Sequence, residues 1–105
     1  MKIHRWDREK DGPPSEDVLR RKLIAEGYEV DRWEYPPGCR FPAHTHDVDK
    51  KDAVVSGRFR LTINGVSVVL EPGDVLDIPR GTVHAAEVVG DEPVVSLDAI
   101  RRARP

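Results

Sequence analysis

The chain contains a series of short alternating segments separated by turn residues, and this series constrains the fold most strongly. Phe59, Leu61 and Ile63 alternate with polar residues, the pattern of a β-strand with one buried face. Asn64-Gly65 follows, a dipeptide that favours a type I′ hairpin turn. Strands are expected at 28–35, 41–46, 53–55, 58–63, 66–70, 75–78, 83–89 and 94–100. Short strands at such regular spacing predict an all-β sandwich or barrel.

The remaining segments predict one domain with short additions. Residues 1–14 are polar and end in Gly-Pro-Pro, so we expect a loosely held lead-in. Residues 15–26 predict one short helix on the outside of a sheet, with Ser15 as N-cap and Leu19 and Leu23 on one face. Residues 47–51 predict a charged loop, and residues 101–105 a solvated basic tail. The domain itself is expected over residues 15–100.

Composition excludes several classes of function. The chain has 105 residues and a formal net charge of −2, so nucleic acid is not an expected partner. No apolar run approaches the roughly 18 residues that span a bilayer, so no membrane partner is expected. The N-terminus lacks the apolar region of a secretory signal, and Cys39 is the single cysteine. We therefore expect a cytoplasmic protein without a disulfide framework.

Three of the four histidines lie between Gly38 and His84. His44 and His46 are two residues apart, and residues i and i+2 of a strand point to the same face. His84 lies on a later predicted strand and can bring a third imidazole. The pattern predicts a metal site, and the alternative is a group of barrel residues that bind nothing.

Glycine-anchored spacing adds a family resemblance to this pattern. Gly38 is followed by five residues and then by His44-Thr45-His46, and Gly57 closes the segment. This segment resembles the first motif of the cupin family, which has a glutamate at the position occupied here by Lys50.

The second cupin motif is matched more fully. Gly73, Pro79, Gly81 and His84 stand at the family's spacings, and Val88 replaces its final asparagine. The resemblance implies a cupin jelly-roll (double-stranded β-helix) barrel. It also implies a homodimer, because many cupins form dimers.

The resemblance further implies one divalent metal ion, Fe, Zn, Mn or Ni, bound by His44, His46 and His84. Lys50 does not fit, because a +1 charge about 4 Å from a +2 ion costs roughly 8 kcal/mol at an effective dielectric constant of about 20. Lys50 can be deprotonated near the metal, or the metal can be absent. In the alternative we favour, Lys50 turns away and pairs with Asp47, Asp49 or Asp52.

The predicted function is a small divalent-metal-binding cupin with a small-molecule ligand or substrate. If it is an enzyme, the resemblance implies isomerase, lyase or dioxygenase chemistry, with Lys50 and Asp52 as candidate catalytic residues. Asp52 is a candidate because it shares a face with Lys50 if both lie on one strand. Thiol dioxygenases and some diketone-cleaving dioxygenases resemble the chain in the three-histidine ligand set alone. The alternative is a non-catalytic module that binds a small ligand or senses a metal.

Overall fold

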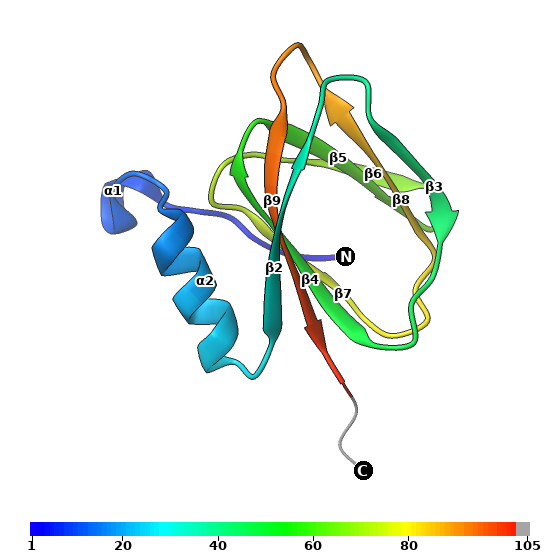
Figure 1. Cartoon of the computed structure of the whole chain (residues 1–105), viewed down its shortest axis with the longest axis horizontal. Coiled ribbons are helices and arrows are strands. Elements are labelled where there is room, and N and C mark those ends of the chain that lie inside the picture. Colours follow the sequence, from blue (N-terminus) through cyan, green and yellow to red (C-terminus); the bar gives the residue numbers. More distant parts are fainter. Residues whose placement is uncertain (103–105) are drawn as a thin grey trace.

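Two antiparallel sheets face each other and form a barrel (Figure 1). The computed structural model describes residues 1–102, so the last three residues of the predicted basic tail lie outside the described residues. The five-stranded sheet has the order β1 (Lys2–His4), β7 (Val75–Ile78), β4 (Asp49–Ser56), β9 (Val94–Arg101) and β2 (Glu29–Tyr35). The four-stranded sheet has the order β3 (Arg40–His44), β8 (His84–Val89), β5 (Arg58–Ile63) and β6 (Val66–Leu70). The predicted all-β barrel is confirmed.

Turn chemistry explains how the strands are connected. Asn64 and Gly65 both have positive φ, 51° and 79°, as a type I′ turn requires. The turn sets the register of β5 and β6, in which Phe59 faces Leu70 and Ile63 faces Val66. The predicted hairpin is therefore present, with Phe59, Leu61 and Ile63 buried.

The main core combines residues from both sheets. It consists of buried aliphatic and aromatic side chains, namely Val54, Phe59, Leu61, Ile63, Leu70, Leu76, Ile78, Val88 and Val94. Burial of such side chains is the principal stabilising contribution in a domain of this size.

A helix covers part of the outer face of the five-stranded sheet (Figure 1). Helix α2 (Glu16–Ala25) begins after Ser15, whose hydroxyl accepts a hydrogen bond from the Val18 amide at 3.3 Å. Leu19 and Leu23 are buried in a second core that includes Ala53 and Leu97. This is the predicted helix in its predicted place. Neither helix within residues 1–102 has the length and apolar character needed to cross a membrane.

The N-terminal segment is more ordered than predicted. Strand β1 pairs with β7, and a single-turn helix, α1 (Arg8–Asp11), follows it. The Arg5 guanidinium donates to the buried Asp74 carboxylate at 2.6 Å, and the Trp6 ring packs directly on Gly73. These contacts are long-range, so local sequence alternation could not predict them.

The predicted charged loop at 47–51 is also partly wrong. Strand β4 begins at Asp49, and its first residues pair with both β7 and β9. Charged residues are tolerated in this central strand because the charges are paired: Lys50 with Asp98, and Lys51 with Glu26. The consequence is that Lys50 and Asp52 stand on one strand, two residues apart.

Candidate metal centre and its pocket

The three predicted histidines meet at one end of the four-stranded sheet. His44 is the last residue of β3, and its pairing partner His84 is the first residue of β8. The predicted strand extended to His46, but β3 ends at His44, so His46 lies in the loop that follows it and not on the same strand. One ligand nitrogen from each of the three residues lies within 4.8 Å of the others. The three histidines selected from the sequence therefore form a cluster within the described residues.

Backbone contacts hold the two histidine-bearing segments together. The Gly81 amide donates to the His46 carbonyl at 2.9 Å. The Arg80 amide donates to the Asp49 carboxylate at 3.0 Å, just beyond the same loop. The register of β3 and β8 is irregular between Phe41 and His44, next to Pro42, which has no amide hydrogen to donate. The loop and the turn thus fix the histidines relative to each other.

Two of the histidines have a defined tautomer. The Nδ1 atom of His44 lies 2.7 Å from the Pro42 carbonyl, and the Nδ1 atom of His84 lies 3.0 Å from the Thr82 carbonyl. A carbonyl oxygen can only accept, so each Nδ1 carries the proton and each Nε2 keeps its lone pair. Backbone carbonyls commonly orient metal-binding histidines in this way.

The Nε2 atom of His46 differs from the other ring nitrogens of the cluster. This atom is buried and has no hydrogen-bond partner among residues 1–102. Burial lowers the pKa of His46, and the positive charge of Lys50 lowers it further. Burial also lowers the pKa of His84 and outweighs the hydrogen bond to Thr82. Both imidazoles are therefore favoured in the neutral form, which is the form that binds a metal ion.

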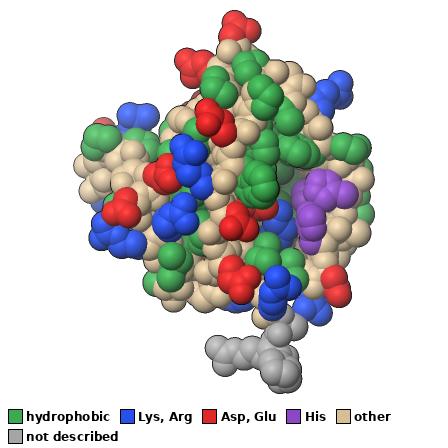
Figure 2. All heavy atoms as spheres, viewed as in Figure 1, with side chains coloured by type: hydrophobic (Ala, Val, Ile, Leu, Met, Phe, Trp, Pro, Cys, Tyr) green, Lys and Arg blue, Asp and Glu red, His purple; other side chains and the backbone are tan. Residues whose placement is uncertain are grey.

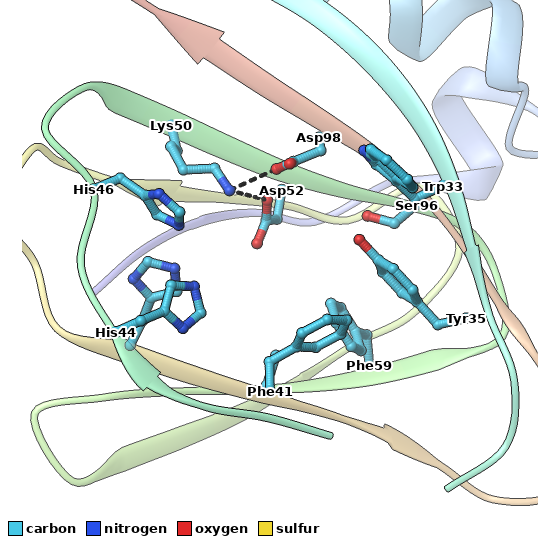
Figure 3. Close-up of a pocket in the computed structure, with 12 residues that line it drawn as sticks. Trp33, Tyr35, Phe41, His44, His46, Lys50, Asp52, Phe59, Ser96 and Asp98 are labelled. Atoms are coloured by element: carbon cyan, nitrogen blue, oxygen red, sulfur yellow. Dashed lines mark ion pairs between the residues drawn. The ribbon is translucent and has the colours of Figure 1, made fainter. Parts of the chain in front are cut away.

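Lys50 enters the barrel beside the histidines but is directed toward carboxylates (Figure 3). Its Nζ atom lies 2.7 Å from Asp98 and 3.8 Å from Asp52. The side chain is 8% exposed. Burial alone lowers the pKa of Lys50, but the contacts with Asp52 and Asp98 outweigh it and leave the pKa raised. The geometry favours a charged, paired lysine over a deprotonated one.

The two carboxyl groups that hold Lys50 differ in their environment. Burial raises the pKa of Asp52 to about 7, against the opposing effect of Lys50. Burial acts in the same direction on Asp98, but hydrogen bonds from Asp52 and Lys50 outweigh it and lower the pKa of Asp98. The arrangement favours a proton on Asp52 and a negative charge on Asp98, directly beside the ammonium group.

Sequence reasoning found part of this arrangement and missed Asp98. Asp52 was one of three predicted partners of Lys50, while Asp47 and Asp49 lie near Arg80 and Arg101 instead. Asp98 stands opposite Asp52 in the pairing of β4 and β9. The available signal was a single charged residue within the mostly apolar segment 94–100.

A cavity of about 340 Å³ opens beside the histidines and contains two unlike walls (Figure 3). One wall carries the three histidines, Lys50, Asp52 and Asp98, and the other carries aromatic side chains. Figure 2 shows histidine atoms at the surface next to a hollow bordered by hydrophobic and charged groups. The cavity is thus open to small molecules from solvent.

Arg40 and Arg60 lie outside this cavity. Both face Glu87, with contacts of 3.7 Å and 2.6 Å, and line a separate depression on the other side of the four-stranded sheet. Neither arginine therefore lies at the candidate metal centre.

Among solved structures, several have the same fold. A cupin protein from Bacteroides fragilis is 27% identical, with a TM-score of 0.65, covering 72% of this chain and 66% of that one. A cupin-like protein from Thermotoga maritima is 26% identical, with a TM-score of 0.66 and coverage of 72% and 58%. The DMSP lyase DddQ from Ruegeria pomeroyi is 25% identical, with a TM-score of 0.64 and coverage of 70% and 38%.

Sequence comparison gives one distant curated relative and a family match. The bifunctional lysine-specific demethylase and histidyl-hydroxylase NO66 of Branchiostoma floridae is 38% identical over 60 residues, which are 53% of this chain. The chain spans only 10% of that protein's length. The family described as "Cupin domain" matches residues 31–100, a segment that includes both histidine motifs, strands β3 to β8 and most of β2 and β9. The chain therefore belongs to the cupin family.

Proposed function

We propose that His44, His46 and His84 bind one divalent metal ion, Fe, Zn, Mn or Ni, through their Nε2 atoms. The observation that carries this proposal is the buried, unpartnered Nε2 of His46 beside two histidines whose Nδ1 atoms already donate to carbonyls. A buried polar atom without a partner is costly unless a ligand satisfies it. Neutral imidazoles suit these metals.

We further propose that the protein acts on a small organic molecule in the adjoining cavity. A bound metal would supply a Lewis acid or an oxygen-binding centre. Lys50 would hold the negative charge of Asp98 beside that centre, and Asp52 would keep a proton available within the cavity. Isomerase, lyase and dioxygenase chemistry all fit these parts, and the distant similarity to a hydroxylase keeps oxygen chemistry among them.

The decisive experiment is elemental analysis of protein purified without an affinity tag, before and after reconstitution. We expect about one metal ion per chain in the wild type and a loss of at least tenfold in affinity in His46→Gln and His84→Ala. His4→Ala is the matched control, because His4 is an exposed histidine next to Asp77, outside the cluster. Circular dichroism checks that each variant is folded. Metal-free protein after reconstitution, or full metal content in both cluster variants, would refute the site.

A second candidate function is a non-catalytic module that binds a small ligand or senses a metal. It is favoured by Lys50, which stands where the family motif has a metal-binding glutamate. The Nζ atom of Lys50 forms an ion pair with the Asp98 carboxylate at 2.7 Å. Asp52→Ala or Lys50→Ala with metal retained would abolish turnover in an enzyme. A screen of small substrates that detects binding without turnover would support the module.

The homodimer and the cytoplasmic location stay predictions, testable by light scattering and by fractionation.

A further inference from the structure

The cavity beside the histidine cluster has an aromatic wall that the proposed metal centre does not use. Tyr35 makes an edge contact with Phe41 at 4.8 Å between ring centroids and a stacked contact with Phe59 at 5.6 Å. These rings come from β2, β3 and β5, and they lie across the cavity from the histidines (Figure 3). Three strands from two sheets thus contribute to one apolar surface.

Trp33 extends this surface toward solvent. It lines the same cavity and is 51% exposed, although a tryptophan of a folded domain is usually well buried. It is on the same strand as Tyr35, two residues away, and the two side chains therefore share a face. An exposed ring at the rim of an aromatic-lined cavity is suited to contact a ligand.

The charges of the cavity favour an anion over a cation. Asp98 is already engaged by the Lys50 ammonium at 2.7 Å, so it offers little free negative charge to a ligand. Asp52 is buried behind Lys50, and burial raises its pKa to about 7, which keeps a proton on it in mildly acidic solution. A divalent ion on neutral histidines adds positive charge to this balance. Burial also raises the pKa of Tyr35, so its hydroxyl stays protonated and can donate a hydrogen bond.

We propose that the cavity binds a small aromatic carboxylate, with the carboxylate toward the three histidines and the ring against Tyr35, Phe41 and Phe59. The recognition of the carboxylate rests on the proposed metal centre, whereas the recognition of the ring rests on the aromatic wall. The volume of about 340 Å³ limits the ligand to a compact molecule, because ligand pockets span roughly 300–1,000 Å³. Ring contacts of this kind prefer edge-to-face or offset packing.

The test is isothermal titration calorimetry of the zinc-reconstituted protein with four probes. Benzoate is expected to bind at least about tenfold more tightly than acetate, because burial of the phenyl ring adds favourable transfer free energy. Benzyl alcohol, which lacks the charge, and benzyltrimethylammonium, which reverses it, are expected to bind more weakly than benzoate. Equal affinity for acetate and benzoate, or tighter binding of the cation, would overturn the proposal.

Two variants and one control locate the ring. Trp33→Ala removes an exposed side chain at the rim, and Phe41→Leu removes a ring while keeping an apolar residue. Each is expected to weaken benzoate several-fold while acetate is unchanged. Val66→Ala, at an exposed hydrophobic residue that does not line this cavity, is the matched control. Benzoate affinity that is unchanged in both Trp33→Ala and Phe41→Leu would contradict the assignment of the wall.

Metal content, measured on the same samples, distinguishes failure of the proposed ligand class from failure of the proposed metal centre. One zinc per chain without a preference for benzoate would refute the ligand class and leave the metal centre standing. Failure of the wild type to take up zinc, iron, manganese or nickel would refute the metal centre and, with it, the carboxylate assignment.

Discussion

Two neighbouring lysines of β4 show how similar charge pairs can have different consequences on the two faces of a sheet. Lys50 points into the barrel and is 8% exposed, and Lys51 points to the outer face and is 13% exposed. Each ammonium lies near two carboxylates, Asp98 and Asp52 for Lys50, and Glu26 and Asp77 for Lys51. What differs is the surroundings of the carboxylates.

On the outer face, the partners of Lys51 tie elements together. Glu26, at 2.6 Å, follows helix α2 and is half exposed, so this pair attaches the end of the helix to the sheet. Inside the barrel, Asp52 and Asp98 are mutual partners on adjacent strands and line the cavity that also contains the histidines. The outer pair is therefore an architectural contact, and the inner group combines a structural contact with the chemistry of the cavity.

Replacement of each lysine by methionine should separate these roles most strongly. At pH 8 we expect Lys50→Met to lower the free energy of unfolding by about 3–5 kcal/mol, because it leaves buried carboxylates without their cation. Lys51→Met should lower the free energy of unfolding by about 1 kcal/mol or less, because the Glu26 carboxylate remains in contact with solvent. Urea denaturation of both variants measures the difference. Equal losses would show that the inner group has no special electrostatic cost.

The pH dependence of stability should identify Asp52 as the unusual member of the inner group. Burial raises the pKa of Asp52 to about 7, so between the ordinary value of 3.8 and about 7 the folded state binds a proton that the unfolded state has released. Stability from this group therefore falls as pH rises across that window and is constant above it.

Asp52→Asn should remove this dependence. The histidines contribute with the opposite sign below their ordinary pKa of 6.5, because the pKa values of His46 and His84 are lowered and the folded state resists their protonation. The difference between wild type and Asp52→Asn cancels the histidine contribution. We expect the variant to become more stable relative to the wild type as pH rises from 4 to about 7, as measured by urea denaturation. A difference that is constant over this range would contradict a raised pKa of Asp52.

The smallest expected effect is on the histidines themselves. After burial, the charge of Lys50 is the largest cause that lowers the pKa of His46. Lys50→Met should therefore raise the pKa of His46 in the metal-free protein, and Lys51→Met should leave it nearly unchanged. Titration of the imidazole resonances by NMR measures both. An equal shift in the two variants would mean that the inner lysine does not act on the cluster.

The same two lysines also show how far sequence reasoning extends. The alternation of residues, the Asn64-Gly65 turn and the glycine-anchored motifs were enough to predict the barrel and to select His44, His46 and His84. These signals are local, and His44 and His84 lie at the ends of paired strands while His46 lies in the loop just after β3. The direction of the Lys50 side chain was harder to predict, because it depends on Asp98, which is 48 positions away in the chain.

Long-range register is the information that the sequence pattern lacks. The pairing of Asp52 with Asp98 follows from how β4 lies against β9, and nothing in either segment specifies it alone. The charged segment 47–51 predicted a loop because the partners that neutralise its charges, such as Glu26 and Asp98, lie far away in the sequence. The order of residues 1–14 was missed for a related reason, since Asp74 and Gly73 hold them from a distance.

The pairing of β1 with β7 has a consequence for the boundaries of the folding unit. The family match begins at residue 31, but strand β1 covers the edge of β7 and helix α2 covers apolar side chains on the outer face. A chain trimmed to the matched segment would present an open strand edge beside an uncovered hydrophobic surface. Such edges template intermolecular strand addition. The first thirty residues therefore cover a strand edge and an apolar surface that the matched segment alone would leave open.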